Sequence, residues 1–161
     1  MTLRNSLFLV FLLIVAASCD KKRLFDEYKK VGQSWHKDSI VTFSVEQKDT
    51  VSKHNLYINI RNNKNYPFNN LFLIVEMVQP GKKAVVDTLE YQMAKPDGTL
   101  LGEGLTDTKD NPLFYKENFV FPKAGNYQFY IQQAVRKSGK IEGVEALEGV
   151  TDVGLRIEKT E

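Results

Sequence analysis

The chain has 161 residues, of which 42% are hydrophobic and 26% charged, enough for one ordinary domain and too few for two comfortable ones. Its 22 basic and 20 acidic side chains leave a net charge of +2, which excludes a strongly basic nucleic-acid-binding protein, and the hydrophobic share excludes a disordered tail. The single cysteine, Cys19, excludes an intramolecular disulfide and every zinc site that needs two thiolates. Only two histidines are present, His36 and His54, which nearly excludes a multi-histidine centre as well, so we expect no metal.

The first eighteen residues have the pattern of a signal peptide. Arg4 supplies the positive start, residues 7–15 carry no polar side chain, and the small residues 16–18 follow. The apolar stretch 7–17 is eleven residues long, whereas a spanning helix needs about 20. The sequence therefore predicts a cleaved signal and no permanent transmembrane segment.

The cysteine that follows these small residues indicates lipid attachment. Ala16-Ala17-Ser18-Cys19 resembles a bacterial lipobox, with alanine where the usual motif has leucine. In such signals the cysteine thiol receives a diacylglycerol. A peptidase then cuts before the cysteine, here between Ser18 and Cys19, and the new amino terminus is acylated, for example with palmitate. Cleavage would leave 143 of the 161 residues, and two or more acyl chains would anchor them stably. The alternative is an ordinary secreted protein cut after Ser18.

A charged stretch separates the cysteine from the folded part of the chain. Residues 20–30 hold eight charges in eleven positions and show little apolar periodicity. We interpret them as a solvated linker. The predicted domains are thus a lipoprotein signal peptide over 1–18, a lipidated tether over 19–38 and a β-sandwich over 39–161.

From residue 39 onward the hydrophobic pattern has a period of two, which is typical of half-buried strands. Residues 71–79 are apolar on both faces, as a central strand would be, and Pro80-Gly81 ends them with a turn. About seven or eight strands are expected, without a convincing amphipathic helix. Their predicted ranges are 39–48, 54–62, 71–79, 85–93, 116–121, 126–135 and 152–158.

These strands predict an all-β fold, a single antiparallel β-sandwich following the cleaved signal peptide. Residues 124–129 resemble the tyrosine corner of immunoglobulin-like sandwiches, with Tyr127 as the corner and Phe129 in the place of the second cysteine. The expected arrangement is therefore immunoglobulin-like.

No arrangement of residues suggests catalysis, so we expect no enzyme. The chain has no Gly-x-Ser-x-Gly elbow, no phosphate-binding loop and no His-Glu-x-x-His. Tyr66 and Phe68, in the connection between two predicted strands, are instead candidates for a partner-contact loop. The alternative is that both rings fold inward and close the end of the core.

Several stretches together resemble the GldH family of gliding-motility lipoproteins, over essentially the whole chain after the signal. They are residues 35–39, 56–71, 87–91, 93–98, 101–102, 115–118, 124–129 and 147–156. The resemblance implies a lipid-anchored envelope protein, needed for gliding and for the linked type IX secretion machinery, with no catalytic activity and no cofactor. Only the lipid-bearing position carries over by residue, to Cys19.

The resemblance also implies partners and a location. The partners would be other envelope proteins of the gliding and secretion machinery, with the membrane reached through the lipid and no nucleic acid involved. The location would be the outer membrane. Asp20 is followed by three basic residues rather than by the acidic cluster common in surface-exposed lipoproteins of such bacteria, so we expect the periplasmic side. A glycan- or peptidoglycan-binding sandwich module is the alternative function.

Overall fold

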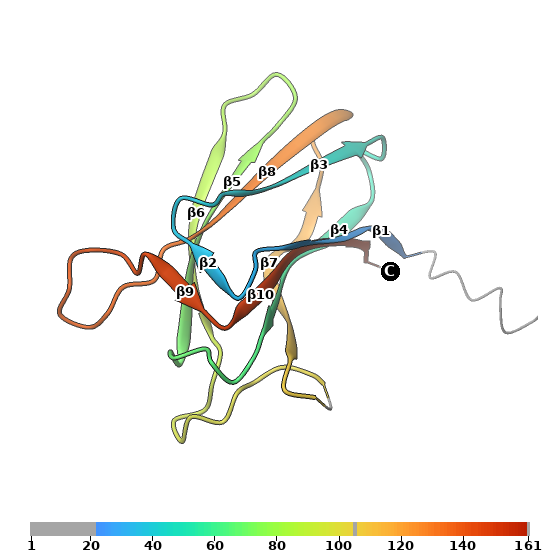
Figure 1. Cartoon of the computed structure of the whole chain (residues 1–161). Helices are drawn as coiled ribbons and strands as arrows, with labels where there is room; N and C mark the ends of the chain where they lie inside the picture. The colour runs from blue at the N-terminus through green and yellow to red at the C-terminus, as the bar shows by residue number, and fades with distance from the viewer. Residues whose placement is uncertain (1–21, 105, 161) are drawn as a thin grey trace, which may run out of the picture.

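The computed structural model describes residues 22–104 and 106–160, which form ten β-strands and no helix (Figure 1). The signal peptide, Ser18 and Cys19 lie outside the described residues. The strands are β1 (Arg23–Lys30), β2 (Ser34–His36), β3 (Val41–Gln47), β4 (Lys53–Asn62), β5 (Asn70–Val78), β6 (Val85–Gln92), β7 (Lys109–Val120), β8 (Gly125–Gln133), β9 (Ala146–Glu148) and β10 (Val150–Lys159).

The ten strands pair as one long nested hairpin. The innermost pair is β5 with β6, followed outward by β4 with β7, β3 with β8, β2 with β9 and β1 with β10, all antiparallel. Two further pairings, β10 with β4 and β5 with β8, roll this hairpin into two sheets. Sheet A has the order β1-β10-β4-β7, sheet C has the order β3-β8-β5-β6, and the short pair β2-β9 forms sheet B.

Sheets A and C pack face to face and enclose the core, as Figure 1 shows. The alternation predicted from the sequence is visible in β5, where Leu71, Leu73, Val75 and Met77 point inward and are buried. The prediction of an all-β antiparallel sandwich is thus confirmed, and β5 is an interior strand of its sheet as expected.

The immunoglobulin-like detail is not confirmed. An immunoglobulin sandwich has sheets ABED and CFG, whereas the nested pairing of eight long strands found here is typical of a jelly roll, which contains two Greek keys. The local tyrosine motif is nevertheless present. The Tyr127 hydroxyl donates to the Lys123 carbonyl at 2.7 Å, and Phe129 is fully buried. A tyrosine corner therefore indicates a β-sandwich, but it does not determine the order of the strands in the two sheets.

The sheet structure also begins earlier than the boundary predicted at residue 39. Residues 23–30, assigned to the tether from their charge, form β1 and pair with β10 from Arg23 to Lys30. Phe25 points inward, where its ring packs edge-on against Phe43 at 6.2 Å. Lys29 donates to the Thr42 carbonyl oxygen at 2.5 Å and so links β1 to the edge of the other sheet.

The pair β2-β9 closes one end of the sandwich. Trp35 and Leu147 face each other in its register and are both fully buried. The Trp35 indole Nε1 donates to the Ser39 carbonyl at 2.7 Å, so the polar edge of the ring is satisfied inside the core. Three-residue strands carry too little periodicity to be predicted, and both were missed.

Candidate functional site

The predicted lipid site can be placed only through the residue at which the described structure begins. Lys22 adjoins the first residue of β1, and its carbonyl accepts a hydrogen bond from the Lys159 amide at 2.8 Å. The start of β1 and the end of β10 therefore lie at the same end of the sandwich, as Figure 1 shows. Cys19 precedes Lys22 by three residues. A lipid on Cys19 would hold this end of the fold toward the membrane.

The predicted contact loop is folded inward. Tyr66 is 5% exposed and belongs to the core, and its hydroxyl donates to the Asn70 carbonyl at 2.7 Å. Phe68 is partly buried, packs against the core and meets Tyr66 edge-on at 6.1 Å. A close approach to Gly149 fixes the loop further, since a Cβ there would lie 2.3 Å from the Tyr66 amide nitrogen. The two rings thus close the end of the core. This arrangement is the alternative that the sequence analysis left open.

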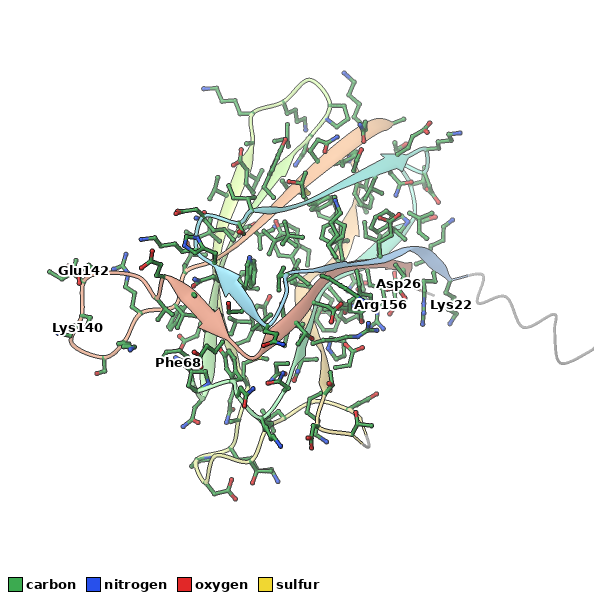
Figure 2. The ribbon with its side chains drawn as sticks, in the orientation of Figure 1. Lys22, Asp26, Phe68, Lys140, Glu142 and Arg156 are labelled. Carbon is green, nitrogen blue, oxygen red and sulfur yellow. The ribbon has the colours of Figure 1, made fainter. Side chains whose placement is uncertain are left out.

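The outer face of sheet A carries a layer of tyrosine and arginine side chains that pack on one another. The Arg61 guanidinium lies 3.8 Å from the centre of the Tyr28 ring, and the Arg156 guanidinium lies 4.4 Å from that of Tyr57. The Tyr57 ring in turn packs on Phe114 at 4.4 Å. We call this set the tyrosine–arginine layer; Figure 2 shows Arg156 there beside Asp26, its neighbour in the register.

Asp110 joins the layer to the edge strand β7. The single Tyr28 hydroxyl proton is shared between the two Asp110 carboxylate oxygens, each 3.0 Å from the hydroxyl oxygen, and the carboxylate also pairs with Arg61 Nε at 3.2 Å. Burial, and then the hydrogen bond to Asp110, raise the pKa of Tyr28 to about 12. Tyr28 is therefore a protonated donor at neutral pH and does not act as a base.

Gly154, the register neighbour of Tyr28 on β10, leaves space for the Tyr28 ring. A Cβ at Gly154 would lie 2.9 Å from the Glu27 carbonyl oxygen and 2.9 Å from Tyr28 Cδ1. Real Cβ atoms essentially never approach other atoms this closely. The tyrosine ring can therefore pack here only because Gly154 has no side chain.

The outer face of sheet C has a different character. A shallow groove of about 440 Å³ lies over β5, β6 and the segment that follows β8. It is lined by Phe72, Ile74, Thr88, Ala134 and Arg136. The outward apolar positions of β5 explain why the sequence of this strand is apolar on both faces.

A polar cluster ties β6 to β7, across the edge where the two sheets meet. The Asp87 carboxylate accepts hydrogen bonds from the Tyr115 hydroxyl and from Lys116 Nζ, both at 2.9 Å. Burial alone would raise the pKa of Asp87, but the bonds from Lys116 and Tyr115 outweigh it and hold this pKa below its usual range. The Tyr91 hydroxyl donates to the Phe114 carbonyl at 2.6 Å and completes the link.

The two histidines lie apart. His54 is fully buried at the start of β4, with its ring 5.2 Å from Phe121, and burial lowers its pKa below 6.5. His36 is half-exposed beside Asp38 and Glu145, each at 3.7 Å. Within residues 22–104 and 106–160, no group of three or more His, Cys, Asp or Glu side chains is placed to hold a metal ion.

Comparison with known proteins identifies the family. The profile described as "GldH lipoprotein" matches residues 23–157. The chain belongs to the GldH lipoprotein family. It is 59% identical over 99% of both chains to "Gliding motility lipoprotein GldH" of Flavobacterium johnsoniae. It is 50% identical to a "Gliding motility lipoprotein GldH homolog" of Christiangramia forsetii, covering 94% of this chain and 93% of that one.

Among solved structures, a family GH115 4-O-methyl-alpha-glucuronidase matches with a TM-score of 0.44 at 13% identity. The match covers 89% of this chain and 18% of the glucuronidase. The VP2 subviral particle of infectious bursal disease virus matches with a TM-score of 0.38, also at 13% identity, over 86% of this chain and 33% of the VP2 chain.

The GldH family match agrees with the folded boundaries. It starts at Arg23, the first residue of β1, so the charged segment belongs to the family domain. No helix in the part of the chain that the structure describes is long and apolar enough to span a membrane. The tyrosine–arginine layer was not predicted from the sequence. The alternation Tyr57-Asn59-Arg61 on β4 was its one signal, but its partners come from three other strands.

Proposed function

We propose that this chain is a lipid-anchored cell-envelope protein required for gliding motility and for the linked type IX secretion machinery. The observation that carries the proposal is the similarity, over nearly the full length of both chains, to two gliding motility lipoproteins. The place of Cys19, after three small residues and four positions before β1, supports lipid attachment there.

The proposed role is non-catalytic, namely to bind other envelope proteins of the machinery. The chemistry of the described polar groups supports it. Burial raises the pKa of Tyr91 to about 12 and also raises that of Tyr115, so both are hydrogen-bond donors at neutral pH. Asp87 and Asp110 are occupied by internal ion pairs. These groups stabilise the fold and are poorly suited to transfer protons to a substrate.

The test is complementation of a strain that lacks the gene, with the wild type, Cys19→Ala and the matched control Ser18→Ala. The control keeps a small residue before the cysteine, so it should incorporate labelled palmitate, while Cys19→Ala should not. We expect the empty strain and Cys19→Ala to lose colony spreading and secretion. Labelling that persists in Cys19→Ala would disprove the lipid site, and normal spreading without the gene would disprove the motility role.

The proposed location is the periplasmic face of the outer membrane. It rests on the residues after the cysteine, where one acidic residue is followed by Lys21, Lys22 and Arg23. We expect the protein to fractionate with the outer membrane and to survive protease treatment of intact cells. Its removal by such shaving would place it on the cell surface instead.

The alternative function, a glycan- or peptidoglycan-binding module, depended on exposed aromatic rings. Trp35 and Tyr66 are buried, which removes its main support. Crosslinked pull-down from native membranes should therefore recover envelope proteins. Recovery of peptidoglycan or polysaccharide instead would favour the alternative.

A further inference from the structure

We propose that the end of the sandwich next to the lipid-bearing residue is a bilayer-contact surface that binds anionic phospholipid headgroups. The proposal rests on the lipid attachment at Cys19 proposed above. We call this surface the anchor end and the opposite one the far end. The anchor end consists of residues 22–23, 48–53, 79–84, 121–124 and 159–160. The far end consists of residues 31–40, 63–69, 93–104, 106–108 and 134–149.

Hydrogen bonds and strand register connect the segments of the anchor end one after another, from the end of β10 to the turn between β5 and β6. The Thr160 amide donates to the Lys53 carbonyl at 3.0 Å, and Lys53 is the register partner of Val120, just before the 121–124 turn. A Cβ on Gly125 would lie 2.9 Å from Pro80, which places the 79–84 turn beside it. Figure 2 shows Lys22 at this end and Lys140 on a loop that extends from the other side of the molecule.

Covalent geometry limits how far this end can lie from a membrane. Arg23, the start of β1, follows Cys19 by four positions. A fully extended chain of that length spans at most about 14 Å. This reach is less than twice the Debye length of about 8 Å at physiological ionic strength. The tether therefore holds the anchor end, rather than the far end, toward the headgroups.

The charge of the two ends differs in the direction that an anionic surface requires. The anchor end carries eight basic side chains and one acidic side chain, whereas the far end carries six basic and seven acidic. The acidic one, Asp49, forms an ion pair with Lys159 at 2.6 Å. Among the described residues, Lys82, Lys83 and Lys123 form no ion pair. A whole-chain charge of only +2 conceals this separation.

An apolar side chain is displayed among these lysines. Val51, at the turn between β3 and β4, is 84% exposed. The turn is well ordered, since Asp49 Oδ1 accepts hydrogen bonds from the amides of Val51 at 3.0 Å and Ser52 at 2.9 Å. An ordered turn that presents a valine beside basic residues suits the headgroup boundary, where lysines meet phosphates and apolar groups enter the acyl region.

The experiment uses the full lipidated protein, reconstituted into vesicles of phosphatidylcholine alone or of phosphatidylcholine with phosphatidylglycerol. A fluorescent label is placed by Val51→Cys or, as the matched control, by Ile141→Cys, since Ile141 is a similarly exposed apolar residue of the far end, at 89%. Quenching by spin-labelled headgroups measures contact with the bilayer. We expect strong quenching at position 51 on anionic vesicles, weak quenching there on neutral vesicles or in high salt, and little at position 141 throughout.

Charge reversal isolates the electrostatic contribution. A lysine near an anionic surface favours contact by about fivefold, so Lys82→Glu/Lys83→Glu should lower the docked-to-undocked ratio by more than about 25-fold. The matched pair Lys137→Glu/Lys140→Glu at the far end should leave quenching unchanged. Equal quenching at positions 51 and 141, or at position 51 on both vesicle types, would overturn the proposal. Flotation with vesicles reports the lipid anchor separately, so its failure would instead count against the proposed attachment at Cys19.

Discussion

The outer faces of sheets A and C are made of strands of similar length, but their side chains are arranged differently. On sheet A, Arg61 packs over the Tyr28 ring and Arg156 packs over the Tyr57 ring, and Asp110 bonds to Tyr28 and Arg61. On sheet C, the outward residues leave a groove of about 440 Å³. The charged face is thus covered by contacts among its own side chains, whereas the less charged face is the hollowed one, so the two faces should respond differently to added or removed side-chain volume.

The largest expected effect comes from filling the space under the tyrosine–arginine layer. Gly154→Val would force Cγ atoms into Tyr28 and the β1 backbone, because even a Cβ lies 2.9 Å from both. We expect a loss of about 3 kcal/mol in the free energy of unfolding, measured by chemical denaturation.

The matched control is Ala134→Val, which adds carbons to the groove on sheet C. Its effect should stay below about 0.5 kcal/mol. If both substitutions lower the free energy of unfolding by the same amount, the two faces do not differ in packing.

Removal of an aromatic ring from each face should give a smaller difference. Tyr57→Ala loses a cation–π contact with Arg156 and a ring contact with Phe114, both at 4.4 Å. We expect it to destabilise the protein by about 1 kcal/mol more than Phe72→Ala, the typical value of such contacts beyond area burial. Thermal and urea unfolding of both variants would measure the difference, and a larger loss for Phe72→Ala would contradict it.

The edge that joins the two faces should respond to acid. The folded pKa of Asp87 is lowered, so the stability that it contributes is present above the unfolded value of about 3.9 and is lost as the pH falls below that value. Asp87→Asn should cost about 1 kcal/mol at neutral pH and weaken the pH dependence of unfolding below about pH 4. An unchanged acid limb in Asp87→Asn would show that other carboxylates produce it.

The smallest effect is on the ionisation of Tyr28. Asp110→Asn removes a negative charge but leaves the burial, the largest cause of the shift, so the pKa of Tyr28 should fall from about 12 toward 10.0 without reaching it. The difference in tyrosine absorbance titration between Asp110→Asn and Asp110→Asn/Tyr28→Phe would isolate this group. A pKa that stays at about 12 would mean that Asp110 does not contribute.

The value of the sequence prediction varied from strand to strand for a physical reason. Apolar and polar residues alternate in β3, β4, β5, β8 and β10. The sequence of each of these strands therefore predicts which of its side chains face the core. Strand β1 is mostly charged, and its place in the sheet depends on pairing with β10 and on the inward contact of Phe25. Both contacts join residues that are far apart in the sequence, so a local pattern could not predict them.

The candidate residues divide in the same way. The lipid attachment predicted at Cys19 rests on a contiguous motif, as recognition by a processing enzyme requires, and it can be read in one segment. Tyr66 and Phe68 face the core rather than a partner because of contacts with Gly149 and Asn70. No local sequence pattern could predict these contacts. The sequence alone left both readings open.

By itself, the sequence determined the all-β class, the positions of the strongly alternating strands and the family, because each depends on residue types and local spacing. Only the tertiary structure decided the jelly-roll order, the inward turn of the aromatic loop, the layer over Gly154 and the separation of charge between the two ends. These features arise when segments far apart in the chain meet: the eight basic residues of the anchor end come from five separate segments. Their charges are dispersed along the sequence and become one surface only when the nested hairpin rolls up.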